Sequence, residues 1–202
     1  MKFDVIVVGG GPSGATAAED LARGGAKVAL LDRAGRIKPC GGAVPPRLIQ
    51  DFAIPDSQIV ARIKTARMIS PTGRSVDIAI ENGYVGMVDR EHFDDFLRRR
   101  AVKAGATLLE GTFTAIERDA DGTHVIYRDK RSGDAMRLTA RLIIGADGAR
   151  SGVARAEVPG GDTIPYVIAY HEIIEAPLAA ADYDPTRCDV IYDGRISPDF
   201  YG

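Results

Sequence analysis

The sequence predicts an α/β fold, because it opens with an apolar strand, a glycine-rich turn and a helix of small residues, and strands separated by turn residues follow. A strand that runs through a glycine turn into a helix is typical of sheets with parallel strands. The chain has 202 residues, of which 45% are hydrophobic and 27% charged. This length suits one domain and part of a second.

The first elements are predicted to be a strand, a helix and a second strand. Residues 3–8 are apolar and β-branched, as in a central strand buried on both faces. Residues 14–23 carry small side chains at helical spacing, and two glycines then end the helix. Residues 27–31 form the second strand, which ends at Asp32.

The middle of the chain is predicted to hold a loop, a hairpin and an amphipathic helix. Prolines and glycines in residues 33–46 exclude a regular element there, so an ordered loop is expected. Residues 66–70 and 74–80 flank a proline-initiated turn, which indicates a hairpin. Asp89 caps a helix over residues 90–104.

Later segments are typical of strands. Residues 112–117, 124–128 and 136–139 are separated by turn residues and predict a β-meander, and residues 142–145 return to a buried strand. Two further strand-like stretches suggest the start of a second sheet, namely residues 166–174 and 189–192.

The glycine-rich turn has the spacing of a dinucleotide-binding loop. Residues 9–14, GGGPSG, satisfy G-x-G-x-x-G between a strand and a helix, where the glycines permit a tight turn and close approach of a diphosphate. Asp32 follows at the end of the second strand, where a carboxylate can bind a ribose diol. Together they predict a Rossmann-type nucleotide site.

A second glycine-containing segment, GADGARS at residues 145–151, follows an apolar strand. Its small residues would let Asp147 approach a diphosphate or a ribityl chain. Taken alone, the segment is equally well explained as a structural strand-to-helix turn. Its combination with the first glycine loop favours the binding interpretation.

Charge and cysteine content exclude several classes of protein. A net charge of −2 gives no basic surface for nucleic acid. The two distant cysteines, Cys40 and Cys188, predict no disulfide and favour a reducing, cytoplasmic compartment. The start resembles no signal peptide and no apolar stretch is long enough to cross a bilayer, so any membrane contact is expected to be peripheral.

The histidines predict no catalytic or metal site. His92 and His124 are expected on the surface, and His171 is expected to have a structural role in a strand. No group of histidines and cysteines has the spacing of metal ligands, so no metal is expected.

Over its whole length the chain resembles FAD-dependent oxidoreductases of the aromatic hydroxylase superfamily. VDREHFDDFL is similar to the helix whose first arginine, here Arg90, lies by the flavin nucleotide, and GADGARS resembles the superfamily's Asp-Gly fingerprint. More narrowly, the segments KPCGGAVPPRLI, VGMVDREHFD and DVIYDGRISPDFYG resemble the geranylgeranyl reductases of chlorophyll and bacteriochlorophyll biosynthesis.

This resemblance implies a Rossmann-type FAD-binding domain at residues 1–155 with an inserted β-meander, to which residues 57–88 add strands on the substrate side. Residues 156–202 would begin an antiparallel-sheet substrate domain. The implied reaction is NADPH-driven reduction, through FAD, of isolated double bonds in a geranylgeranyl diphosphate or a prenylated pigment, in the cytoplasm or peripherally on a photosynthetic membrane. Since such reductases carry a further flavin motif downstream, the chain is expected to be truncated, to bind FAD weakly and to be inactive alone.

The resemblance also implies a set of cofactor contacts. They are Gly9, Gly11, Pro12, Ser13, Gly14, Asp32, Arg33, Cys40, Gly41, Ala43, Arg90, Thr114 and Asp147. An unactivated alkene needs a proton as well as a hydride, and Cys40 is the candidate catalytic residue. A thiol is a feeble acid towards an alkene, so a packing role for Cys40 beside the cofactor stays open.

Two other functions remain open. A flavin monooxygenase shares the fold and both fingerprints but uses oxygen to hydroxylate an aromatic ring. A non-catalytic fragment that binds FAD is the second alternative.

Overall fold

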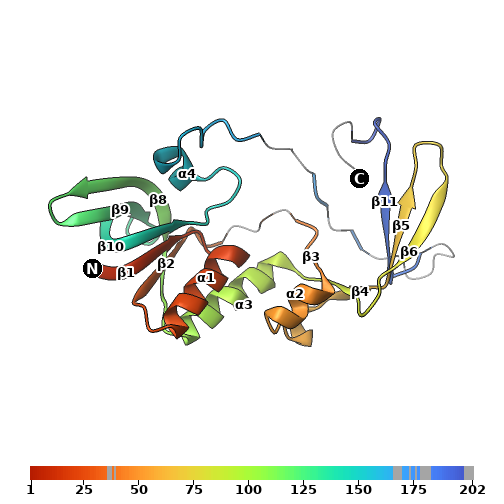
Figure 1. The fold of residues 1–202 in the computed structure, drawn as a ribbon, viewed down its shortest axis with the longest axis horizontal. Helices are drawn as coiled ribbons and strands as arrows, with labels where there is room; N and C mark the ends of the chain where they lie inside the picture. Colours follow the sequence, from red (N-terminus) through yellow and green to blue (C-terminus); the bar gives the residue numbers. More distant parts are fainter. Residues whose placement is uncertain are drawn as a thin grey trace. The chain divides into compact units, whose positions relative to one another are not determined.

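The computed structural model describes residues 1–35, 38, 40–165, 170–172, 174–175, 177 and 183–197. Its chain forms two compact units, each assembled from two stretches of sequence (Figure 1). The first unit combines Met1–Ile37 with Phe93–Tyr166, and the second combines Lys38–His92 with Val167–Gly202. The predicted α/β class is confirmed, and the assignment of 1–155 and 156–202 as functional domains stays a prediction.

The first unit is built on five strands that form a closed barrel in the order β1-β10-β9-β8-β2. Strand β1 pairs in parallel with β2 and β10, β2 pairs in parallel with β8, and β8, β9 and β10 form the predicted antiparallel meander. The strands span Lys2–Val8 (β1), Val28–Asp32 (β2), Thr107–Asp119 (β8), Gly122–Asp129 (β9) and Ala135–Gly145 (β10).

Apolar side chains from these strands make one core. Ile6 and Leu31 of the parallel strands pack in the same cluster as Val125, Tyr127 and Leu138 of the meander. All five are at most 2% exposed. Burial of such side chains is the main force that holds the parallel strands to the meander.

Two long helices accompany this sheet. Helix α1, Pro12–Arg23, and helix α3, Arg90–Lys103, are joined by Glu19, which is 2% exposed and accepts hydrogen bonds from Arg100 at 3.1 and 3.2 Å. Asp89 accepts a 2.9 Å bond from the Glu91 backbone N–H, as expected of a residue that caps α3. A short helix, α4 (Gly152–Glu157), follows β10.

The second unit contains two three-stranded sheets. One has the order β3-β7-β4 and the other the order β11-β5-β6, in which β5 and β6 form the predicted hairpin. The elements are β3 (Ala43–Val44), α2 (Pro46–Asp51), the 3-10 helix η1 (Asp56–Gln58), β4 (Ala61–Ile63), β5 (Thr65–Ile69), β6 (Ser75–Ala79), β7 (Val85–Met87) and β11 (Arg187–Ile191).

Three expectations about elements need correction. The loop 33–46 holds β3, because Ala43–Val44 pairs with β7, and Pro46 begins α2, where a proline in the first turn loses no helical bond. Residues 142–145 continue β10 without a break and are not fully buried, since Leu142 is 54% exposed. Of the strand expected at 166–174, residues 166–169 and 173 lie outside the described residues, and 170–172 and 174 form no strand.

The expectation for His124 was wrong, whereas that for His92 is confirmed. His124 is 2% exposed and lies inside the meander, where its ring nitrogens are 2.9 Å from Thr139 Oγ1 and 2.8 Å from Asp119 Oδ1. These bonds satisfy both ring nitrogens, so the imidazole can be buried. His92 has a side chain that is 77% exposed, and His171 is exposed outside any strand.

No helix in the described part of the chain is long and apolar enough to cross a membrane. Both cysteines are free and exposed.

Candidate dinucleotide-binding site

The two glycine segments predicted from the sequence lie side by side. They follow the neighbouring parallel strands β1 and β10, whose last residues, Val8 and Gly145, are in register. The Ala146 N–H donates to the Val8 carbonyl at 2.7 Å. A Cβ on Gly9, whose φ is +103°, would come within 2.4 Å of the Ala146 carbonyl oxygen. Only glycine therefore fits where the first loop passes the second.

The loop around α1 has the shape required to approach a diphosphate. A Cβ on Gly14 would lie 1.9 Å from the Gly9 carbonyl oxygen, which fixes the tight turn, whereas a Cβ on Gly11 would meet no atom of the described residues within 4 Å. Gly11 therefore borders open space at the start of α1. This helix end has no side-chain cap and no acidic residue in its first turn, so its N–H groups and its dipole favour an anion there.

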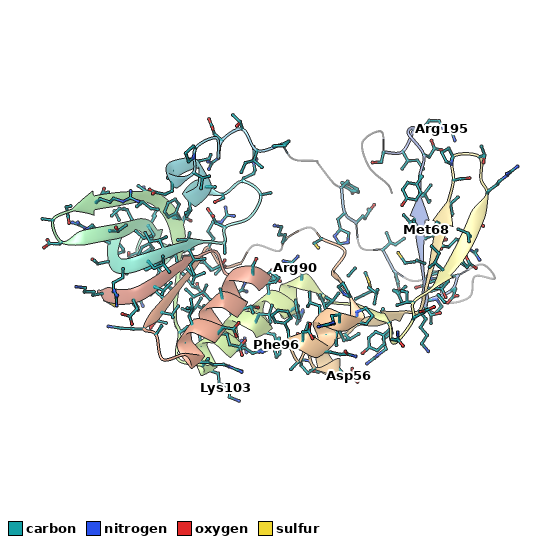
Figure 2. All side chains as sticks on the ribbon, viewed as in Figure 1. Asp56, Met68, Arg90, Phe96, Lys103 and Arg195 are labelled. Carbon is teal, nitrogen blue, oxygen red and sulfur yellow. The ribbon has the colours of Figure 1, made fainter. Side chains whose placement is uncertain are left out.

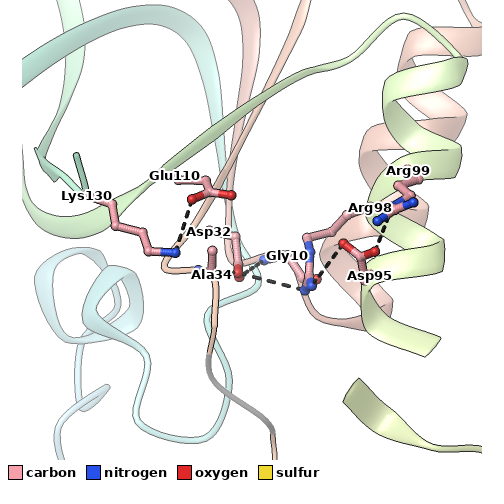
Figure 3. A network of polar contacts seen from close by, with 8 residues as sticks. All are labelled: Gly10, Asp32, Ala34, Asp95, Arg98, Arg99, Glu110 and Lys130. Atoms are coloured by element: carbon pink, nitrogen blue, oxygen red, sulfur yellow. Dashed lines mark hydrogen bonds and ion pairs between the residues drawn. The ribbon is translucent and has the colours of Figure 1, made fainter. Parts of the chain in front are cut away.

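Asp32 is held against this loop at the end of β2 (Figure 3). One carboxylate oxygen accepts from the Gly10 N–H at 2.7 Å and the other from the Ala34 N–H at 2.9 Å. The side chain stays 21% exposed. Each oxygen has a second lone pair, so the carboxylate can also accept hydrogen bonds from the two hydroxyl groups of a ribose.

Arg98 of α3 belongs to the same site, although the sequence analysis did not single it out. Its guanidinium donates to the Gly10 carbonyl at 3.3 Å and lies 3.9 Å from Asp32 Oδ1 (Figure 3). On the other side it lies 3.7 Å from Asp95, which also pairs with Arg99 at 2.7 Å. The sequence shows three consecutive arginines on this helix, at residues 98–100. Nothing in the sequence distinguishes the one that contacts the glycine loop.

A cavity of about 190 Å³ opens beside Asp32. It is predominantly polar, and an ion pair between Lys130 and Glu110 at 3.2 Å lies on its lining. The lining residues all belong to the first unit; they are Asp32, Ala34, Gly35, Asp95, Arg98, Leu108, Glu110 and Lys130.

Asp147 has a structural task in the second glycine segment. Its carboxylate accepts from the Gly152 N–H at 2.6 Å, from the Val153 N–H at 3.3 Å and from the Ser151 hydroxyl. These bonds satisfy the first turn of α4. The structure therefore supports the turn interpretation of GADGARS directly, and a contact of Asp147 with a cofactor stays a prediction.

Two further predicted residues of the first unit lie apart from the glycine loop in sequence. Arg33 follows Asp32 and is exposed. Thr114 lies at the irregularity in the pairing of β8 with β9 and donates its hydroxyl to the Ile126 carbonyl at 3.0 Å. Their contact with a cofactor also stays a prediction.

The other predicted contacts belong to the second unit and are described within it. Gly41 and Cys40 are exposed, and Ala43 pairs with Met87 in β3 and β7. Between them, Gly42 has a φ of +70°, and a Cβ there would lie 2.1 Å from the Val88 carbonyl oxygen. The Cys-Gly-Gly segment is thus bound closely to the chain before α3.

Arg90 is the first residue of α3, and Figure 2 shows it at the opposite end of this helix from Lys103. The described residues contain no group of three or more metal-ligating side chains.

Two family profiles match the chain. A family described as "FAD binding domain" matches residues 53–164, and one described as "NAD(P)-binding Rossmann-like domain" matches residues 7–51. The second match covers the glycine loop, Asp32 and Cys40, and the first covers α3, the meander and Asp147.

Curated relatives match this chain over its whole length. A geranylgeranyl diphosphate reductase of Rhodobacter capsulatus is 68% identical over 202 residues, which are 100% of this chain and 51% of that protein. A chloroplastic geranylgeranyl diphosphate reductase of Oryza sativa subsp. japonica is 37% identical over 100% of this chain and 46% of its own length. The chain thus spans about half the length of these relatives.

Among solved structures, a geranylgeranyl bacteriochlorophyll reductase-like protein of Thermoplasma acidophilum superposes with a TM-score of 0.75. It is 21% identical and covers 95% of this chain and 50% of its own. At this identity the comparison shows a shared fold.

Proposed function

Because the chain belongs to the FAD-binding domain family, we propose that it is the flavin-binding part of an oxidoreductase that reduces double bonds of a geranylgeranyl group. The 68% and 37% identity to geranylgeranyl diphosphate reductases supports this substrate class. The observation that carries the proposal is the placement of Asp32 against the Gly10 N–H, beside the open space at Gly11.

The residues present fit the adenosine and diphosphate parts of FAD. The start of α1 has no side-chain cap and borders open space at Gly11 among the described residues, so its N–H groups would hold the diphosphate. The carboxylate of Asp32 would accept hydrogen bonds from the ribose hydroxyls. The cavity beside it has a mostly polar lining, which would contact the adenine base. FAD, when bound, supplies hydride transfer to the substrate.

Asp32 also bears on which dinucleotide this loop holds. A carboxylate repels the 2′-phosphate that distinguishes NADPH, and it favours a ribose with both hydroxyls free. Asp32 thus disfavours NADPH in this loop, and the match to the FAD binding domain family makes FAD the proposed resident dinucleotide. NADPH is the proposed reductant that meets the flavin without occupying this site.

Reduction of an isolated double bond also requires a proton, because an alkene without an activating group is a poor hydride acceptor. Cys40 remains the proposed residue beside the reacting centre. Its thiol is free and exposed, and Gly41 and Gly42 place backbone without side chains next to it. Substitution of Cys40 decides whether its thiol donates the proton or only packs beside the cofactor.

The proposed substrate is geranylgeranyl diphosphate or a prenylated pigment of chlorophyll-type biosynthesis. The proposed location is the cytoplasm, with peripheral contact to a photosynthetic membrane that carries such substrates.

A chimaeric protein tests the proposal. These 202 residues replace the matching half of the Rhodobacter capsulatus relative, and bound FAD, NADPH oxidation and geranylgeranyl products are measured. We expect stoichiometric FAD and reduction of the geranylgeranyl double bonds. If NADPH oxidation instead consumes one equivalent of oxygen and yields a hydroxylated product and water, rather than hydrogen peroxide or a reduced prenyl group, the protein is a monooxygenase. A chimaera without FAD would contradict flavin binding by this chain.

A further inference from the structure

We propose that Arg98 is a positioning residue that holds Asp32 and the glycine loop in the geometry needed to bind the adenosine ribose. This inference rests on the proposed function, since it concerns the same FAD site. It adds a residue from α3 to a site otherwise formed by β1, β2 and the turn between β1 and α1.

Arg98 contacts both Gly10 and Asp32. One guanidinium nitrogen, Nη1, lies 3.3 Å from the Gly10 carbonyl and 3.9 Å from Asp32 Oδ1. Asp32 Oδ2 in turn accepts from the Gly10 N–H at 2.7 Å. Gly10 is thus held at its carbonyl by Arg98 and at its N–H by Asp32, and the two side chains also face each other.

Arg98 also packs closely against the glycine loop. A Cβ on Gly10 would lie 2.9 Å from Arg98 Cδ and 2.8 Å from Asp32 Cβ, so both side chains press against the loop. The Arg98 side chain is only 16% exposed, whereas that of its neighbour Arg99 is 81% exposed. A partly buried guanidinium held by one carbonyl and two nearby carboxylates has fewer orientations open to it than a surface arginine has.

The positive charge of Arg98 lies among carboxylates. Three carboxylates line the cavity beside Asp32, and Lys130 pairs with one of them, Glu110. Arg98 lies between the other two, Asp32 and Asp95. Without its charge, these two carboxylates would repel each other through a partly desolvated site. Asp32 would then lose the orientation in which its free lone pairs point to the ribose.

This role makes a specific prediction about the ligand. If Arg98 acts through Asp32, removing it weakens only the part of the binding that depends on the ribose hydroxyls. If Arg98 merely stabilises the fold, its loss weakens every ligand of the loop equally. ADP and 2′,3′-dideoxy-ADP separate the two cases, because they share the base and the diphosphate and differ only in the hydroxyls.

The experiment measures both dissociation constants by calorimetry on the flavin-free protein and three variants. Arg98→Met keeps the methylene stem beside Gly10 and removes the charge, Arg98→Lys keeps a charge without the fork, and Arg99→Met is the matched control on the exposed face. We expect Arg98→Met to weaken ADP about tenfold and dideoxy-ADP by less than about twofold. Arg98→Lys should recover part of the loss, and Arg99→Met should equal the wild type.

Two results would overturn the inference: equal weakening of both nucleotides in Arg98→Met, or unchanged ADP affinity in a variant that is folded by circular dichroism. If Arg98→Met does not fold, Arg98→Lys decides in the same way, through the ratio of the two affinities. Failure of the proposed function is distinct, because then the wild-type protein itself binds neither ADP nor FAD.

Discussion

At the scale of single residues, the two predicted cofactor carboxylates, Asp32 and Asp147, differ in how many hydrogen bonds the protein donates to them. Asp147 accepts three hydrogen bonds, from Ser151 and the first turn of α4. Asp32 accepts two backbone N–H bonds and lies beside a cavity. Asp32 is the last residue of β2, and Asp147 lies in the glycine-containing segment that follows β10. A carboxylate has about four lone-pair sites, so Asp32 keeps more of its acceptor capacity for a ligand than Asp147 does.

Asp32→Ala should weaken ADP and FAD about tenfold or more, because a charge-assisted hydrogen bond is worth roughly 1.5 to 3 kcal/mol. Fluorescence titration of FAD measures the effect. Asp4→Ala is the control, since Asp4 also accepts a backbone N–H, that of Lys27 at 2.9 Å, but lies near the start of β1, whereas the loop follows the other end of this strand. Unchanged affinity in Asp32→Ala would remove Asp32 from the site.

A pH-dependent contribution is expected from Asp119. Hydrogen bonds from His124, from the Asp121 N–H and from Arg137 lower the pKa of this carboxyl well below its usual value. A carboxyl with a lowered pKa stabilises the fold above the unfolded pKa of about 3.9, and the contribution is lost as pH falls through the folded value.

Asp119→Asn should therefore be less stable than the wild type at pH 7, and the difference should shrink from about pH 4 downward. Urea unfolding at a series of pH values measures it. Asp121→Asn is the control, because only its backbone N–H contacts Asp119. A difference that stays constant down to pH 2 would show that the charge of Asp119 is not involved.

At the scale of elements, the β1–α1 turn combines glycines with different tasks. Gly14 is required by the close approach of Gly9, whereas Gly11 has an extended backbone with φ of −71° and open space around it. Gly14 thus maintains the turn, and Gly11 leaves room for the proposed ligand.

Substitutions at these two glycines should have separable effects. Gly14→Ala should destabilise the protein by about 1 to 3 kcal/mol or prevent folding, because its Cβ overlaps the Gly9 carbonyl. Gly11→Ala should leave the melting temperature nearly unchanged and weaken FAD, since its methyl group enters the proposed diphosphate space. Thermal unfolding and FAD titration on the same samples check both. Normal FAD affinity in Gly11→Ala would place the diphosphate elsewhere.

At the scale of the whole molecule, the proposed adenosine site lies within one of the two units. The glycine loop, Asp32, Arg98 and the cavity all belong to Met1–Ile37 and Phe93–Tyr166. Cys40, Gly41, Ala43 and Arg90 belong to the other. The proposed reacting centre and the adenosine site thus draw on separate units.

A shortened protein tests this division. If residues 40–88 are replaced by a flexible linker and the chain ends at 166, the first unit should still fold and bind ADP with an affinity within about threefold of the intact chain, since its core is its own. Circular dichroism and calorimetry measure this. An unfolded or non-binding product would show that the second unit is needed for the adenosine site.

The sequence by itself determined the features that depend on neighbouring residues. The β1–α1–β2 unit, the hairpin, the cap at Asp89 and the position of Asp32 follow from local periodicity, turn residues and spacing, and the structure shows each of them. Such patterns act over a few residues, where backbone preference and alternation of apolar side chains decide the outcome.

Tertiary structure alone decided the contacts between distant segments. Arg98 reaches Gly10 across 88 positions, His124 is buried because Asp119 and Thr139 satisfy its ring, and Ala43–Val44 becomes a strand only by pairing with β7. No local pattern encodes these outcomes, because each depends on which side chains the packed sheet brings within hydrogen-bonding distance. Burial of a polar group is favourable only when such partners are present, and only the folded chain supplies them.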